Sequence, residues 1–205
     1  VRFLDQFFGP RKVVIVGWSR SAIGAPVSVL TTLNDYGYSG EIYVINPNMT
    51  QTDADNFTVC ASLDELPDDI ELAVVSVARE QVHDVLKGCI AKGIKGAIVI
   101  TQGFADADEE GGRLQEEMLE LARDNGMRIL GPNTIGIADA FSCFTSSFIE
   151  LENDKTAIGQ VSQSGLFMMG HHLINNEPAG FCKSIDLGNA SDIDLVDVLT
   201  YFEQS

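Results

Sequence analysis

The sequence predicts an α/β fold, in which a doubly wound parallel sheet precedes a second and shorter α/β unit. Two observations carry this prediction. Apolar runs of strand length recur along the chain, and stretches with helical spacing of apolar residues lie between them as far as Leu130. Because a strand, helix and strand in succession form a right-handed crossover, the successive strands are expected to be parallel.

The first predicted strand, 12–17, is rich in β-branched residues of the kind buried on both faces of a parallel sheet. A helix is expected over 25–36, where Val29, Leu30 and Leu33 recur at helical spacing before Gly37 ends it. The same pattern predicts further strands at 41–45, 71–77, 96–100 and 127–130, and further helices at 80–92 and 108–124.

The alternation changes after Gly131-Pro132, where a Ser- and Phe-rich stretch, 141–148, alternates like a strand or hairpin arm. We place a domain boundary near 138, so that residues 1–138 and 139–205 form separate domains. The second is expected to contain strands at 156–161 and 181–187 and helices at 166–175 and 195–202. Two or three strands make a thin sheet, and the chain starts at Val1, so we expect a truncated second domain in a piece of a longer protein.

The amino-acid composition argues against several classes of function. The 205 residues include 13 Lys and Arg against 30 Asp and Glu, a formal net charge of −17 that disfavours nucleic-acid and membrane-surface partners. No apolar stretch approaches the roughly 20 residues of a membrane span, and the acidic start is unlike a signal peptide, so a cytoplasmic location is expected. Neither the four Cys nor the three His are spaced as metal ligands, and no metal site is predicted.

The turn 17–24, Gly-Trp-Ser-Arg-Ser-Ala-Ile-Gly, is the first candidate for binding chemistry. A small-residue loop between a strand and a helix directs free backbone N–H groups toward an anion. Ser19 and Ser21 add hydroxyl donors, and Arg20 adds a guanidinium suited to phosphate. The alternative is a tight turn with no ligand, and the spacing is not the GxGxxG of dinucleotide-binding proteins.

The end of the second strand argues against a nicotinamide dinucleotide. In proteins that bind nicotinamide dinucleotides, an acidic residue at this point normally hydrogen-bonds the ribose hydroxyls, but this chain has Asn46-Pro47-Asn48. Pro47 fixes its own φ and can turn the two Asn side chains toward the crevice at the sheet edge, although an ordinary β-turn explains the same residues. Another adenine nucleotide therefore remains possible.

Further loops are expected at the same edge of the sheet. Thr101-Gln102-Gly103 follows the fourth strand, and Asn133 and Thr134 follow the fifth, and the carboxyl ends of parallel strands are where such sheets assemble sites. In the second unit, Ser162-Gln163-Ser164-Gly165 precedes a helix and forms another candidate anion cradle, or a plain N-cap.

These motifs, in this order, resemble the NDP-forming (ADP-forming) acyl-CoA synthetases, which are related to the succinyl-CoA synthetase α subunit. The resemblance covers nearly the whole chain. It rests on the opening 4–13, the turn Gly17-x-Ser19-Arg20, and 40–47 with its Asn46-Pro47, together with Gly103-Phe104, 131–136, 162–165 and Leu187-Gly188-Asn189.

The resemblance implies a Rossmann-like CoA-binding domain followed by part of a succinyl-CoA-ligase-like, flavodoxin-like domain. It implies an acid–thiol ligase that makes acyl-CoA, ADP and phosphate from a small carboxylic acid, CoA and ATP, through an acyl phosphate and a phosphohistidine. Ser164 and Gly165 would receive that phosphohistidine, and Asn133 and Thr134 would lie near the CoA thiol. The implied CoA-binding residues are Gly17, Ser19, Arg20, Ser21, Ile23, Asn46, Pro47, Asn48, Val77, Thr101, Gln102, Gly103, Asn133 and Thr134.

The chain departs from the family pattern in ways that limit this transfer. Many relatives have Lys where this chain has Asn48, and several have Cys where it has Thr134. In the family, the phosphorylated His follows the Gly188-Asn189 motif, and the given sequence ends at Ser205 before that position. No catalytic residue is therefore assigned, and this chain alone is expected to be inactive. An ATP-grasp domain or subunit, with ATP or ADP and Mg²⁺, is implied as partner, and a homo- or hetero-oligomer is possible.

Two other functions are alternatives for this sequence. The same architecture could serve as a CoA- or nucleotide-binding regulatory module fused to an acetyltransferase, without phosphohistidine chemistry. Asn in place of the downstream His would favour that alternative. A nicotinamide oxidoreductase is disfavoured by Asn46-Pro47 and by the lack of a proton-transfer residue.

Overall fold

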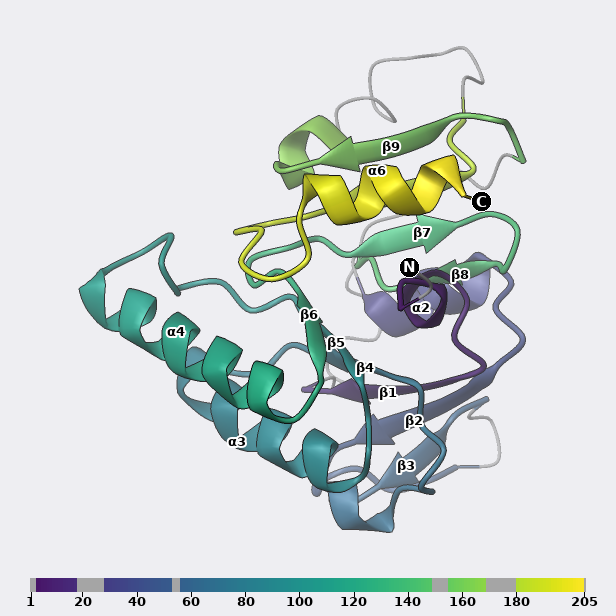
Figure 1. The fold of residues 1–205 in the computed structure, drawn as a ribbon. Coiled ribbons are helices and arrows are strands. Elements are labelled where there is room, and N and C mark those ends of the chain that lie inside the picture. Colours follow the sequence, from purple (N-terminus) through teal and green to yellow (C-terminus); the bar gives the residue numbers. More distant parts are fainter. Residues whose placement is uncertain (1–2, 18–27, 53–55, 149–154, 169–179, 205) are drawn as a thin grey trace.

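The computed structural model describes residues 3–17, 28–52, 56–148, 155–168 and 180–204. Its larger sheet has six parallel strands in the order β3-β2-β1-β4-β5-β6 (Figure 1). This order confirms the doubly wound sheet, with β1 and β4 side by side at the point where the strand order reverses. The strands are β1 Lys12–Val16, β2 Glu41–Ile45, β3 Thr58–Cys60, β4 Leu72–Val75, β5 Gly96–Val99 and β6 Arg128–Leu130.

Both faces of this sheet are buried because alternate residues of each strand enter different cores. On β1, Val13 and Ile15 join the core that includes α1 Asp5–Phe8 and α2 Val29–Asp35. Val14 and Val16 join the opposite core, which is covered by α3 Arg79–Ala91 and α4 Glu109–Asp124 (Figure 1). A short 3₁₀ helix, η2 Leu63–Glu65, packs near α3.

A smaller four-stranded sheet has the order β8-β7-β10-β9. β7 runs antiparallel to both β8 and β10, whereas β9 is parallel to β10. α6 Leu195–Glu203 follows and is capped by Asp194, whose carboxylate accepts from Val196 N and Asp197 N. The strands are β7 Ile137–Asp139, β8 Phe144–Thr145, β9 Gly159–Ser162 and β10 Lys183–Asp186.

The two sheets share one hydrophobic core. Phe8 of α1 stacks on Tyr201 of α6 with ring centroids 5.2 Å apart, and both belong to the cluster that contains Val13 and Ile185. β7 pairs with β10 from residue 137 onward, so the change from the first sheet to the second falls in the loop 131–136, and residue 138 lies inside β7. The division into domains 1–138 and 139–205 stays a prediction.

The main differences from the sequence prediction lie in the shortest elements. β3 was not predicted, because three residues are too few to show an alternation and only Cys60 among them is buried. The stretch 141–148, expected as a strand or hairpin arm, contains the second arm of a hairpin, in which 140–143 form the turn and β7 and β8 the arms. The expected helix 166–175 is seen in its first turn, up to Met168, and the rest lies outside the described residues. No described helix is long and apolar enough to cross a membrane.

Candidate functional site

The carboxyl ends of β1, β2, β4, β5 and β6 lie at one edge of the large sheet, because parallel strands end on the same side. Gly17 shows how closely these ends pack. Its φ is +101°, and a Cβ placed there would lie 2.1 Å from the backbone oxygen of Ser76. Only glycine allows the chain leaving β1 to pass this close to the end of β4.

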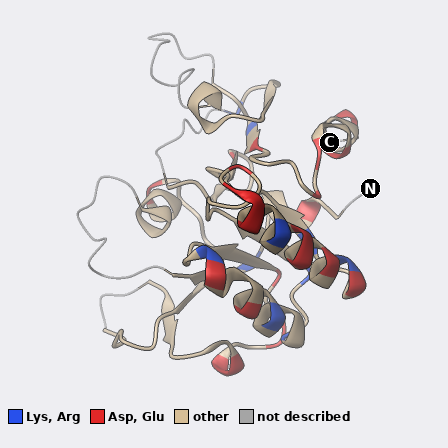
Figure 2. Ribbon diagram, turned by 90° about the vertical axis from the view of Figure 1, so that its left-hand side faces the viewer, with Lys and Arg blue, Asp and Glu red and all other residues tan. Residues whose placement is uncertain are grey.

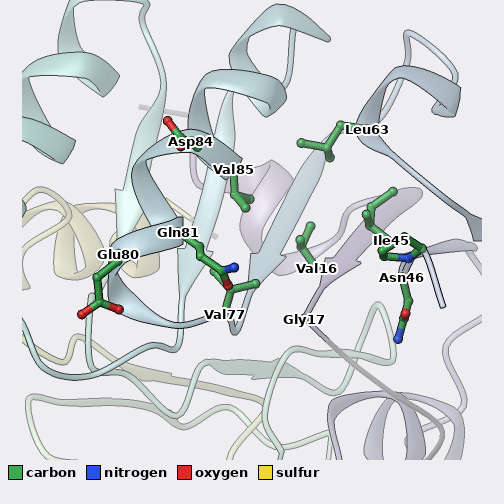
Figure 3. Close-up of a pocket in the computed structure, with 11 residues that line it drawn as sticks. Val16, Gly17, Ile45, Asn46, Leu63, Val77, Glu80, Gln81, Asp84 and Val85 are labelled. Carbon is green, nitrogen blue, oxygen red and sulfur yellow. The ribbon is translucent and has the colours of Figure 1, made fainter. Parts of the chain in front are cut away.

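A first cavity of about 550 Å³ opens at this edge between the strand ends and α3 (Figure 3). Apolar side chains from β1, β2, η2 and α3 form its walls, and they point toward its centre in Figure 3. Its charged groups are two carboxylates, Glu80 and Asp84, and no Lys or Arg is among the described residues that line it. Those residues are Val16, Gly17, Ile45, Asn46, Pro47, Leu63, Val77, Glu80, Gln81, Asp84 and Val85.

A second cavity of about 670 Å³ lies between the edge of the large sheet and the second sheet, and it shares Val77 with the first. Its lining is more polar and includes the guanidinium of Arg79 and the carboxyl of Asp186. The other described lining residues are Ser76, Val77, Ala78, Ile100, Thr101, Gln102, Asn133, Thr134, Ile135, Phe148, Gln163, Ser164 and Gly165.

Hydrogen bonds between loops fix the second cavity. Thr101 Oγ1 donates to Val77 O at 2.7 Å, and Asn133 N donates to Thr101 O at 2.9 Å. Arg79 Nη1 donates to Gly103 O at 2.7 Å and to Asp108 Oδ2 at 3.0 Å, which ties the start of α3 to the loop after β5. The loops that follow β4, β5 and β6 are therefore held as one unit.

Asp186, at the end of β10, connects the second sheet to the same unit. Its Oδ2 accepts from Ile135 N at 2.8 Å, and its Oδ1 accepts from Gly188 N at 3.3 Å. The residue is 1% exposed, and burial raises the pKa of its carboxyl above the ordinary value of 3.8, against the lowering effect of these hydrogen bonds. A buried carboxyl thus holds two loops at the cavity wall.

The serine loop after β9 lies on the opposite side of the second cavity. Ser164 N donates to Ser162 Oγ at 3.1 Å, and Ser162 Oγ donates to Ser164 O at 2.8 Å, so Ser162 holds the turn. The Ser164 hydroxyl has no hydrogen-bond partner among the described residues and lines the cavity. A Cβ on Gly165 would lie 2.7 Å from Ile135 Cγ2, so glycine lets the loop approach the first sheet.

A third cavity of about 700 Å³ continues from the second, with which it shares Asn133, Gln163 and Ser164. Asn189 lines it, and its Nδ2 lies 2.9 Å from both Asp106 Oδ1 and Gln115 Oε1. The motif Leu187-Gly188-Asn189 therefore bridges the second sheet to the loop before α4.

The structure brings most of the predicted site residues to these cavities. Gly17, Asn46 and Pro47 line the first, and Val77 lines both the first and the second. The second is also lined by Thr101, Gln102, Asn133, Thr134, Ser164 and Gly165. Their roles in binding stay predictions.

Two of the predicted residues that the structure describes are not brought to the wall of any of the three cavities. Asn48 lines none of the three cavities, and its N–H donates to Asn46 Oδ1 at 2.9 Å, which closes the turn after β2. Gly103 also lines none of them, and its carbonyl accepts from Arg79. Ser19, Arg20, Ser21 and Ile23 lie outside the described residues.

The sequence analysis missed the contribution of α3 and of β10. Glu80, Gln81 and Asp84 line the first cavity from the first turns of α3, and Asp186 lines the second. A helix that begins directly after a strand at the carboxyl edge was a usable signal for α3. Asp186 gave no signal, because its position depends on how the second sheet packs.

Acidic groups surround this edge. α4 carries six Asp or Glu and two Arg, in keeping with the net charge (Figure 2). Within the three cavities, the one basic side chain among the described lining residues is Arg79. A negatively charged ligand must therefore be held by a few local groups.

Comparisons with known proteins agree with this geometry. The family model described as "CoA binding domain" matches residues 11–140. Acetate–CoA ligase (ADP-forming) II of Archaeoglobus fulgidus is 34% identical over 203 residues, which cover 97% of this chain and 30% of the ligase. The α subunit of acetate–CoA ligase (ADP-forming) II from Pyrococcus furiosus is 33% identical over 97% of this chain and 43% of that subunit.

A solved structure gives the same picture. The apo form of the dinucleotide forming acetyl-coenzyme A synthetase 1 of Ca. Korarchaeum cryptofilum superposes with a TM-score of 0.85 at 31% identity, covering 98% of this chain and 43% of the synthetase chain. The chain thus spans less than half the length of the relatives it matches. With the family model matching 130 of its 205 residues and the doubly wound sheet in place, the chain belongs to the CoA binding domain family.

Proposed function

We propose that the chain binds coenzyme A along the carboxyl edge of the large sheet. The observation that carries this proposal is that two cavities of different character at that edge share Val77 in their walls. The first has apolar walls suited to a planar base, and the second has the polar groups that the amides of the pantetheine arm require.

The residues at this edge fit the molecule. Gly17 leaves backbone space where a side chain would clash, and it leads into the turn that carries Arg20. Gln102 and Asn133 place amide groups along the second cavity. Coenzyme A, when bound, supplies the thiol that takes up an acyl group. Thr134 and Asn133 would surround that end, beside the Ser164 hydroxyl.

We further infer that the chain is the CoA-binding part of an ADP-forming acyl-CoA synthetase. The ADP-forming ligases among its relatives support this inference. The full reaction would convert a small carboxylic acid, CoA and ATP to acyl-CoA, ADP and phosphate, with an ATP-grasp domain or subunit as partner and Mg²⁺ on that partner. A cytoplasmic location belongs to the same proposal.

In this reaction, Ser164 and Gly165 would receive a phosphohistidine carried outside this chain. Ser162 holds their turn, so the Ser164 hydroxyl is free to donate to an incoming phosphoryl oxygen. The cavity that they line also holds Thr134 and Asn133, so phosphoryl group and thiol would meet between the two sheets.

Calorimetric titration of the 205-residue chain with CoA, with NADH as the comparison ligand, tests the binding proposal. Saturable binding of CoA with little or none of NADH is expected. Binding of NADH without CoA would overturn the proposal. The ligase assignment has its own test, in which the chain is combined with a partner that supplies the reactive His and the ATP-grasp domain. Acyl-CoA should then form from acid, CoA and ATP, and no turnover would reject the assignment.

A further inference from the structure

Gln81 is a neutral polar side chain of the first cavity that the binding proposal has not used. Gln81 lies in the first turn of α3 and lines the cavity together with Val77 and Val85. Figure 3 shows its amide directed toward Val77 and the cavity centre, whereas the carboxylate of Glu80 points away. Gln81 therefore presents a neutral hydrogen-bonding group among apolar walls.

This amide is available to a ligand. Among the described residues, none donates to or accepts from the Gln81 side chain. The other amide in the cavity, that of Asn46, already accepts from Asn48 N at 2.9 Å. Gln81 is thus the group whose donor and acceptor are both open toward the space between Val16, Ile45 and Val85.

The charges decide which end of coenzyme A enters this cavity. Glu80 and Asp84 line it, and no described lining residue is basic. Both carboxylates have a cation beside them, since Arg79 Nε lies 3.1 Å from Glu80 Oε1 and Lys87 Nζ lies 3.8 Å from Asp84 Oδ1. A pyrophosphate or ribose phosphate therefore finds no basic side chain among the described lining residues, whereas an uncharged aromatic base would lose little by leaving water for apolar walls. The second cavity, by contrast, has Arg79 on its wall.

We propose that Gln81 reads the adenine base of coenzyme A, and so determines which base this site accepts. The inference rests on the proposed function. Adenine places a hydrogen-bond donor, its amino group, beside an acceptor nitrogen on either side, and a glutamine amide offers the matching acceptor and donor. Gln81 is exposed in the unliganded chain. A bound base that covers this amide without pairing with it removes the amide from water and leaves a polar group without a partner.

The test compares Gln81→Leu with the wild-type chain by calorimetry, using three probes. The probes are CoA, 1,N6-etheno-CoA, whose bridged base lacks the amino hydrogens, and 4′-phosphopantetheine, which has no base. Wild-type protein should bind CoA about fivefold or more tightly than etheno-CoA. Gln81→Leu should weaken CoA binding by a similar factor, bring the ratio between CoA and etheno-CoA toward one, and leave 4′-phosphopantetheine binding unchanged.

A matched control is Glu120→Leu, which changes an exposed polar residue of α4 away from the three cavities. It should bind all three probes as the wild-type chain does. If Gln81→Leu lowers the melting temperature, Gln81→Ala is measured instead. An unchanged ratio between CoA and etheno-CoA in the variant overturns the role of Gln81 while the proposed function stands. No CoA binding by the wild-type chain overturns both.

Discussion

The first and second cavities lie on the same sheet edge but are built in different ways. The first is formed mainly by apolar side chains at strand ends and on α3, and no basic side chain is among its described lining residues. The second lies between two sheets and is held by hydrogen bonds that link Val77, Thr101, Asn133 and Asp186 to neighbouring loops.

Because of this difference, the two cavities suit different parts of a ligand. The first cavity can hold a flat, uncharged group mainly through apolar contact, whereas the second can position polar and reacting groups because its loops are fixed relative to each other. Substitutions at the end of β1, beside the first cavity, should therefore alter the shape of the binding site. Substitutions in the wall of the second cavity should weaken the connection between the two sheets.

Gly17→Ala should have the largest effect. The new Cβ would meet the Ser76 carbonyl at 2.1 Å, at a φ of +101° that L residues rarely adopt. We expect a loss of more than about 4 kcal/mol of unfolding free energy, the range of severe core disruptions, and loss of CoA binding. Urea unfolding and calorimetry measure the two effects.

Gly37→Ala is the matched control for this change. Gly37 also has a positive φ, +85°, but a Cβ there would meet nothing within 4 Å. It should cost only about 1 to 2 kcal/mol and leave CoA affinity unchanged. Equal effects of the two substitutions would show that the close approach at Gly17 does not shape the cavity.

Asp186→Ala should have an intermediate effect, on stability first. Ile135 N and Gly188 N would lose their acceptor in a buried position, which typically costs about 1 to 3 kcal/mol. The free energy of unfolding from urea titration is the measurement. A cost within about 0.5 kcal/mol of zero, the level of ordinary surface substitutions, would contradict the linking role of Asp186.

The pH dependence of Asp186 gives a second check. Burial raises its pKa in the folded protein, so the folded state holds this proton more tightly than the unfolded chain. The stability it contributes is therefore full below its ordinary pKa of 3.8 and declines as pH rises through the folded value. Compared with Asp186→Asn, the wild-type chain should lose stability steadily as the pH is raised from 4, and the opposite slope would be inconsistent with a raised pKa.

Asn48→Lys should have the smallest effect, and in the favourable direction. Asn48 is exposed beside the first cavity and contributes its backbone N–H, not its side chain, to the turn. A lysine there adds one solvent-exposed phosphate contact, worth about 0.5 to 1 kcal/mol, or roughly two- to fivefold in CoA affinity. The increase in CoA affinity should become smaller as the salt concentration is raised in the titration. An increase that does not depend on salt concentration would exclude a phosphate contact.

Much of the fold could be predicted from the sequence, because its long elements have clear periodicity. β2 was predicted with the bounds it has, and α3 and α4 to within about one residue. β3 could not, because a three-residue strand is defined by its partners and not by its own pattern. The hairpin of β7 and β8 was predicted only in part, as a strand or hairpin arm over 141–148, because β8 has two residues.

The candidate site was predictable where it depends on loops at strand ends, as with Asn46, Thr101 and Asn133. It was not predictable where it depends on tertiary packing. Gln81 is an exposed helical residue in the structure as well, and only the placement of α3 against the strand ends reveals its position at the cavity. Asp186 is buried only because β10 lies between β7 and β9.

The central claim is that coenzyme A lies along the carboxyl edge of the large sheet with its base in the first cavity. A crystal structure of the chain with CoA measures this directly. The account predicts electron density for adenine between Val16, Val77 and Val85, within hydrogen-bonding distance of Gln81, with the pantetheine arm continuing past Thr101 toward Asn133. Adenine density in the second cavity, or an empty sheet edge at saturating CoA, would contradict it.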